Sequence, residues 1–297
     1  MLHKGDKNAF DADKSSTFEK DPSKKWKIEY GDGSEASGIV GYDTVTIGGL
    51  AIKKQAIELA RHVSRQFAQG TADGLLGLAF HQINTITTKG SPDPQPTPVD
   101  NMITQEDIPK DAELFTSAFY STRDEKAESF YTFGWIDEDL IKASGEKIAW
   151  ADIDNSEGFW KVKSEYATIN GEKVSVSGNT AIVDTGTTLA LMQDDVVDAL
   201  YKAIDGAKYS EEYQGYIVPN SATADKLPEF KVCIGEKEFL IQKEDLLFAP
   251  ADSDYWYGGV QSRGSMPFDI LGDTFLKSIY AVSDTTSPTP FYLCKRS

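Results

Sequence analysis

Apolar and polar residues alternate at period two in many short segments of the chain, a pattern typical of β-strands that bury one face. Residues 26–30 alternate in this way and are followed by a turn, Tyr30-Gly31-Asp32-Gly33-Ser34, and by a second run at residues 38–49. This order predicts a β-hairpin. Similar runs predict strands at residues 115–120, 129–136, 230–234, 239–241 and 279–282. We therefore expect a mainly β protein.

Helical periodicity is rare. Residues 194–204 place Val196, Val197, Leu200, Tyr201 and Ile204 on one face, and Gly206 follows as a stop, so the longest helix is expected here. Prolines crowd residues 89–98, which excludes strand and helix and predicts an exposed loop. Thr97-Pro98 then predicts the start of a short helix through Gln105.

The segment at residues 181–188, Ala-Ile-Val-Asp-Thr-Gly-Thr-Thr, combines a buried strand with a tight turn. The strand delivers one carboxylate, Asp184, to that turn. Gly186 permits another backbone or a substrate to approach closely, and Thr185 and Thr187 offer hydroxyls that can hold the carboxylate. Asp184-Thr185-Gly186 alone also fits an ordinary β-turn. The surrounding sequence is needed to distinguish that turn from a catalytic one.

The composition narrows the classes of protein that are possible. The chain has 297 residues, 40% of them hydrophobic, which is enough for two lobes. Its formal charge of −17 argues against binding to nucleic acid or to an anionic membrane. No apolar run approaches the roughly 20 residues that span a bilayer, and no signal peptide is visible.

Side chains that bind metals or form disulfides are few. The chain has three histidines and lacks metal-ligand spacing, so we expect no metal and no cofactor. Its two cysteines, Cys233 and Cys294, are expected to be free, buried thiols.

Two segments together carry a family resemblance. Ile-Val-Asp-Thr-Gly-Thr-Thr-Leu at residues 182–189 and Phe-Asp-Ile-Leu-Gly-Asp-Thr-Phe at residues 268–275 resemble the pepsin-like (family A1) aspartic proteases of the fungal type. In that family, each of two lobes carries an Asp-Thr-Gly strand beside a strand that ends in two apolar residues and a glycine. The first-lobe counterpart of Ile270-Leu271-Gly272 is Leu75-Leu76-Gly77. The resemblance implies a bilobal fold, with lobes at residues 1–152 and 153–297.

The resemblance also implies roles for individual residues. Asp184 is the catalytic aspartate and Thr185 supports the catalytic turn. The hairpin becomes the flap that closes over peptide, with Tyr30 at its tip and Asp32 facing the first specificity pocket, where an acid favours Lys or Arg beside large apolar residues. The full set of substrate-binding residues that it implies is Tyr30, Gly31, Asp32, Gly186, Thr187 and Thr188.

The family's chemistry needs two aspartates, and the sequence contains one Asp-Thr/Ser-Gly. Gly272 lies 88 positions after Asp184, and the same spacing before Gly77 falls about a dozen residues before Met1. The sequence therefore predicts an N-terminally truncated member with an incomplete first lobe, in which Leu75 and Leu76 lose the strands that cover them. Asp32 and Asp273 are not expected to face Asp184.

Three functions remain open at this point. The first is an acid endopeptidase whose second aspartate lies outside this sequence, and the second is a catalytically inactive peptide-binding or inhibitor-like homologue. The third is a pair of chains that join two copies of Asp184, although a monomer is expected. The family implies peptide or protein substrates, pepstatin-type inhibitors, and an extracellular or vacuolar location.

Overall fold

The computed structural model describes residues 7–125, 127–145 and 148–286, together with the backbone of residues 290–295. Its contacts divide the chain into two compact units. Unit 1 is Met1–Asp111 with Ser156–Gly158, and unit 2 is Ala112–Asn155 with Phe159–Ser297. This division differs from the boundary expected near Asp152, because residues 112–155 supply strands to a sheet of unit 2.

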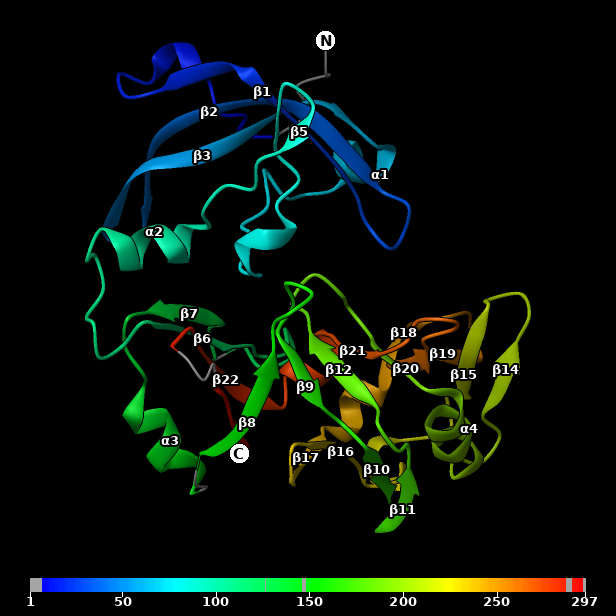
Figure 1. Ribbon diagram of the computed structural model, residues 1–297. Helices are drawn as coiled ribbons and strands as arrows, with labels where there is room; N and C mark the ends of the chain where they lie inside the picture. The colour runs from blue at the N-terminus through cyan, green and yellow to red at the C-terminus, as the bar shows by residue number, and fades with distance from the viewer. Residues whose placement is uncertain (1–6, 126, 146–147, 287–289, 296–297) are drawn as a thin grey trace. The chain divides into compact units, whose positions relative to one another are not determined.

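Unit 1 is built on one five-stranded sheet (Figure 1). Its strands, in sheet order, are β3 (Leu50–Val63), β2 (Glu35–Ile47), β1 (Glu19–Glu29), β4 (Thr87–Thr88) and β5 (Ser91–Pro92). Trp26, Val40 and Ile86 form one buried cluster of its core. The unit also has α1 (Arg65–Gln69), α2 (Pro98–Thr104) and the 3-10 helices η1 (Ala12–Lys14) and η2 (His81–Ile83).

The start of α2 follows the sequence closely. The Thr97 hydroxyl accepts a hydrogen bond from the backbone N–H of Asp100 at 3.1 Å, and the Asp100 carboxylate accepts one from the backbone N–H of Thr97 at 2.9 Å. This capping box, with Pro98 in the first turn, confirms the predicted helix. The proline-rich loop before it was predicted to hold no strand, which is wrong for β5, because proline is tolerated in a short edge strand.

The strand predicted at Leu75-Leu76-Gly77 is not present. Residues 72–80 are irregular. Leu75 is 69% exposed and Leu76 is 45% exposed, as expected for leucines without covering strands. A strand requires a neighbour that satisfies its backbone groups, and the described residues supply none to this segment. The apolar-apolar-glycine pattern alone is therefore not enough to form a strand.

Unit 2 contains three sheets. The largest has ten strands, in the order β20 (Val260–Ser262), β13 (Ala190–Met192), β21 (Asp269–Leu271), β12 (Thr180–Val183), β9 (Lys161–Lys163), β8 (Ala149–Asp154), β23 (Pro290–Lys295), β22 (Ile279–Asp284), β6 (Leu114–Ala118) and β7 (Phe130–Phe133). A four-stranded sheet has the order β11 (Glu172–Ser175), β10 (Tyr166–Ile169), β16 (Phe230–Ile234) and β17 (Lys237–Ile241). Another has the order β14 (Lys208–Ser210), β15 (Gly215–Pro219), β19 (Tyr255–Gly258) and β18 (Leu247–Pro250). The sheets confirm the mainly β prediction.

The helices of unit 2 are short. They are α3 (Glu138–Ser144), α4 (Asp194–Lys202), α5 (Asp273–Leu276) and the 3-10 helices η3 (Ala224–Lys226) and η4 (Lys243–Leu246). The predicted face of α4 is buried, from Val196 to Ile204, which confirms the helical periodicity. Across the described residues, no helix is both long enough and apolar enough to cross a membrane.

The prediction of buried, free thiols is confirmed for Cys233, which is buried and not bonded to another cysteine. Its thiol donates to the backbone oxygen of Gly235 at 3.3 Å, and burial raises its pKa. The side chain of Cys294 lies outside the described residues.

Candidate active site

The Asp184 turn begins where β12 ends. Ala181 and Ile182 of this strand are buried, and β12 pairs antiparallel with β9 on one side and parallel with β21 on the other. The chain then turns at Asp184 and returns as β13, which pairs with the far side of β21. Strand β21, which Gly272 directly follows, therefore lies between the two strands that flank Asp184.

Gly272 is required at this crossing. A Cβ atom at this position would lie 2.1 Å from the backbone oxygen of Thr187 and 2.4 Å from that of Leu189. The next two residues then bind the turn, because the backbone N–H groups of Asp273 and Thr274 donate to Thr187 and Thr188 at 2.8 and 3.0 Å. The strand thus fixes the turn through its backbone.

The Asp184 carboxylate is held at both oxygens. Oδ1 accepts a hydrogen bond from the backbone N–H of Gly186 at 2.9 Å, and Oδ2 accepts one from the Thr187 hydroxyl at 2.6 Å. Such bonds fix the orientation of the group. The carboxylate is half-buried, so it stays accessible from solvent. Of the two hydroxyls that the sequence offers, Thr187 holds Asp184, whereas Thr185 hydrogen-bonds Tyr131.

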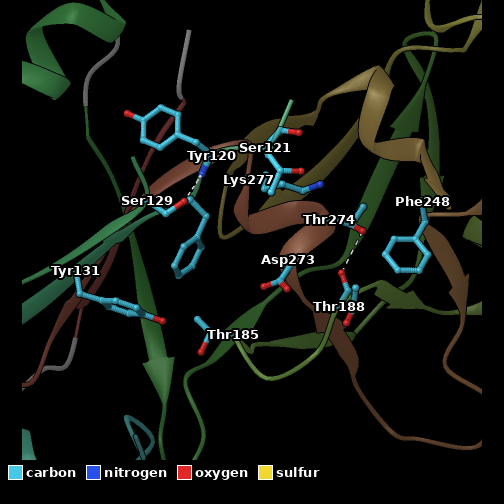
Figure 2. A pocket seen from close by; sticks show the side chains of 12 residues that line it. Tyr120, Ser121, Ser129, Tyr131, Thr185, Thr188, Phe248, Asp273, Thr274 and Lys277 are labelled. Carbon is cyan, nitrogen blue, oxygen red and sulfur yellow. Dashed lines mark hydrogen bonds between the residues drawn. The ribbon is translucent and has the colours of Figure 1, made fainter. Parts of the chain in front are cut away.

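A pocket of about 400 Å³ lies beside this turn, entirely within unit 2 (Figure 2). The Asp-Thr-Gly turn contributes Thr185 and Thr188 to its wall, and the start of α5 contributes Asp273. The remaining lining residues come mostly from the segment around the β6–β7 turn: Phe119, Tyr120, Ser121, Thr122, Ser129 and Tyr131, with Phe248, Thr274 and Lys277.

Asp273 is the second carboxyl group at this site. Its pKa is raised to about 6, mainly by burial; the Lys277 ammonium opposes this shift, and the negative charge of Asp184 adds to it. Asp273 is therefore mostly neutral near pH 4, while Asp184 keeps its two hydrogen bonds. The sequence predicts that Asp273 does not face Asp184. Its electrostatic coupling to Asp184 requires the folded arrangement of β12 and α5.

The predicted flap turn is present in unit 1, between β1 and β2. The backbone N–H of Tyr30 donates to the oxygen of Ser34 at 2.8 Å, and Gly33 adopts a left-handed conformation with φ of 76°. The Asp32 carboxylate accepts from the Ser34 hydroxyl and backbone N–H at 2.6 and 2.9 Å, which lowers its pKa. The Tyr30 ring contacts Phe67 edge-on, with 5.5 Å between ring centroids.

Several residues of the site carried no sequence signal. Phe119 and Tyr131 come from the predicted strands around the β6–β7 turn but reach the pocket only through the pairing of the ten-stranded sheet. Lys277 follows Asp273 by one helical turn, a spacing that by itself indicates no functional site. Within the described part of the chain, no group of three or more His, Cys, Asp or Glu side chains has the arrangement of a metal site.

Comparison with known proteins identifies the family. A family model described as eukaryotic aspartyl protease matches residues 3–289. The chain belongs to this family. Both segments of the Asp184 turn, residues 182–189 and 268–275, lie inside the matched range, and so does the flap turn.

The fungal relatives agree with this membership. The chain is 40% identical to aspergillopepsin-1 of Aspergillus oryzae over 274 residues, which cover 92% of this chain and 65% of the relative. It is 44% identical to aspergillopepsin-1 of Aspergillus fumigatus over 269 residues, with 89% and 63% covered. It is 41% identical to penicillopepsin-1 of Talaromyces stipitatus over 271 residues, with 91% and 65% covered. The chain thus spans less than two thirds of the length of these aspartyl proteases.

A solved structure supports the pepsin-like fold. The crystal structure of the aspartic proteinase from Irpex lacteus matches with a TM-score of 0.80 and 27% sequence identity. The match covers 99% of this chain and 86% of that one. The fold class predicted from the sequence, a pepsin-like acid protease fold, is therefore confirmed.

Proposed function

We propose that this aspartyl protease family member is an endopeptidase that works at acid pH, with Asp184 as one of its two catalytic carboxylates. The second aspartate is not in this sequence. The observation that carries the proposal is the Asp184 turn: one carboxylate, hydrogen-bonded at both oxygens, at the end of a buried strand and still reached by solvent.

The proposed mechanism divides the work between two carboxylates. Two such groups a hydrogen bond apart cannot both ionise, so the pair keeps one proton over a wide acid range. The ionised member takes a proton from a water molecule, and the oxygen of that water attacks the peptide carbonyl carbon. The protonated member donates to the carbonyl oxygen. The bonds from Gly186 and Thr187 hold Asp184 in a fixed orientation for either role.

The proposed substrate is a peptide or protein. We expect Tyr30, Gly31 and Asp32 of the predicted flap turn, and Gly186, Thr187 and Thr188 after Asp184, to be its binding residues, with Thr185 supporting the catalytic turn. The expected preference is for large apolar residues and for Lys or Arg on the acyl side of the cut. We further propose pepstatin-type inhibition and an extracellular or vacuolar location.

The test is cleavage of a denatured protein substrate near pH 4. The chain is assayed alone and after extension with the upstream segment of an aspergillopepsin that contains its first Asp-Thr-Gly. We expect cleavage by the extended chain, inhibition by pepstatin, and a loss of about 10²- to 10⁴-fold in Asp184→Asn. The matched control is Asp205→Asn, an exposed acid of unit 2, which should keep full activity.

The other two functions give different results in the same assay. Pepstatin binding without cleavage, even by the extended chain, would make this a peptide-binding homologue and refute the proposal. Cleavage by the unextended chain that rises steeply with protein concentration and disappears in Asp184→Asn would indicate two paired copies. In the first case there is no catalysis to explain, and in the second the other copy supplies the second aspartate. Neither result requires an aspartate upstream of this sequence.

The role of Asp32 has its own test. Asp32 is exposed and its hydrogen bonds from Ser34 keep it ionised in acid, so it should attract a basic substrate side chain. In Asp32→Asn we expect the rate of cleavage after Lys, relative to cleavage after Phe, to fall roughly threefold, as for an exposed ion pair. Peptides that differ only at that residue provide the measurement. An unchanged ratio would exclude Asp32 from the specificity pocket.

A further inference from the structure

Asp245 is a buried acid that the proposed mechanism does not use. It lies in η4, and its side chain is only 1% exposed. Its Oδ1 atom accepts two hydrogen bonds, each of 2.6 Å, from the guanidinium of Arg123 and the ammonium of Lys277. Its Oδ2 atom is buried and has no hydrogen-bond partner. A buried charge destabilises the fold unless an opposite charge pairs with it. The pairs with Arg123 and Lys277 therefore offset the cost of burying Asp245.

The two cations come from two different segments beside the pocket. Arg123 follows the lining residues Ser121 and Thr122, and it also donates to the Ser121 hydroxyl at 3.1 Å and to the backbone oxygen of Glu244 at 3.3 Å. Lys277 is itself a lining residue, at the end of α5 (Figure 2). Asp245 is therefore a common anchor for the β6–β7 segment and for α5.

Lys277 is attracted by two carboxyl groups. Asp273 precedes it by four residues, a spacing at which acids and lysines pair along a helix. The ammonium nevertheless donates its hydrogen bond to Asp245, and it acts on Asp273 as a nearby charge. The Asp245 carboxylate is almost fully shielded from water, and a charge pair interacts more strongly in such surroundings than in water.

We propose that Asp245 is a positioning residue: its buried carboxylate binds the Lys277 ammonium and holds it away from the Asp273 carboxyl group. The charged and titratable groups that act on Asp273 are Lys277 from α5 and Asp184 from the Asp-Thr-Gly turn, while Tyr131 from β7 is itself affected by the charge of Asp273. A neutral Asp273 adds no second negative charge beside Asp184. Any effect on catalysis rests on the proposed function, whereas the contacts of Asp245 with Arg123 and Lys277 do not depend on it.

The test follows the carboxyl carbon of Asp273 by NMR as the pH is changed, with the full chain. In the unaltered chain we expect a midpoint near 6. In Asp245→Asn the ammonium has Asp273 as its remaining acidic partner, so the midpoint should fall by about one unit or more. In Lys277→Met the ammonium is absent, so the midpoint should rise. The midpoint is thus expected to move in opposite directions in the two variants, whereas a general loss of structure would move it in the same direction in both.

Two controls complete the design. Asp269→Asn removes another buried acid of unit 2 that is paired with an arginine, and it should leave the Asp273 midpoint unchanged if the effect belongs to Asp245. Arg123→Met removes the other cation but leaves Lys277 bound to Asp245, so the midpoint should also stay. A midpoint that rises or does not move in Asp245→Asn would overturn the proposal. If that variant does not fold, an unchanged midpoint in Lys277→Met would do so.

This measurement does not depend on turnover. A fall of the midpoint in Asp245→Asn without any peptidase activity would support the positioning role and count against the proposed function. In an active, extended chain, the same variant should displace the pH profile of cleavage and leave KM unchanged. A change in KM alone would assign Asp245 a role in substrate binding instead.

Discussion

The segments Ile270-Leu271-Gly272 and Leu75-Leu76-Gly77 share one sequence pattern and have different structures. In unit 2 the segment ends a strand inserted between β12 and β13, and Leu271 is fully buried. In unit 1 the segment is irregular, and both leucines are exposed. The glycines differ in the same way, because a Cβ at Gly272 would meet Thr187 at 2.1 Å, whereas at Gly77 it would meet nothing within 4 Å.

This difference shows what the pattern requires. At Ile270-Leu271-Gly272 the chain forms a strand because strands on both sides make hydrogen bonds with its backbone. The same pattern remains irregular where the described chain offers no such partners. The pattern shows where such a strand can form. Whether the strand forms depends on the neighbouring strands.

The largest expected effect comes from filling the two glycines. In Gly272→Ala the added methyl group would meet backbone oxygens that cannot move aside, and we expect the free energy of unfolding to fall by roughly 4 kcal/mol. In Gly77→Ala we expect almost no change. Urea denaturation of both variants measures the comparison. Equal losses would contradict the assignment of Gly272 as the constrained position.

Truncation of the leucines gives the next largest effect. Leu271→Ala removes a fully buried side chain and should cost about 3 kcal/mol, within the usual range for such cavities. The matched variant Leu76→Ala removes an exposed side chain and should change stability by less than about 0.5 kcal/mol. The same denaturation measurement applies, and a large loss for Leu76 would mean that residues 72–80 are covered by another part of the chain.

The sequence predicted the elements whose stability is mainly local. The flap turn, the capping box of α2, the buried face of α4 and the turn at Asp184 all follow from residues that are neighbours in the chain. It failed for residues 72–80, where the outcome depends on strands far away in the sequence. The effect of the Asp184 charge on the pKa of Asp273 carries no sequence signal, because it arises only after β12 and α5 come together in the fold.

A smaller effect concerns the dependence of stability on pH. The folded state raises the pKa of Asp273 from 3.8 to about 6, so it binds more protons than the unfolded state between these values. The contribution of the neutral group is fully present below pH 3.8 and is lost as the pH rises through 6. With allowance for solvent screening, about 1–2 kcal/mol should be lost in this range.

Denaturation at several pH values tests this statement, with Asp273→Asn as the comparison. That variant should remove the loss between pH 4 and 6.5, because its amide does not titrate. An unchanged pH dependence in Asp273→Asn would assign the titration to another group.

The most direct test of the account compares the extended chain with its Asp184→Asn variant, in cleavage of a denatured protein near pH 4. The account predicts that cleavage falls by about 10²-fold or more in the variant, while binding of the unfolded substrate and the fold are retained. Equal rates in the two chains would contradict it, because the Asp184 turn would then have no part in the chemistry.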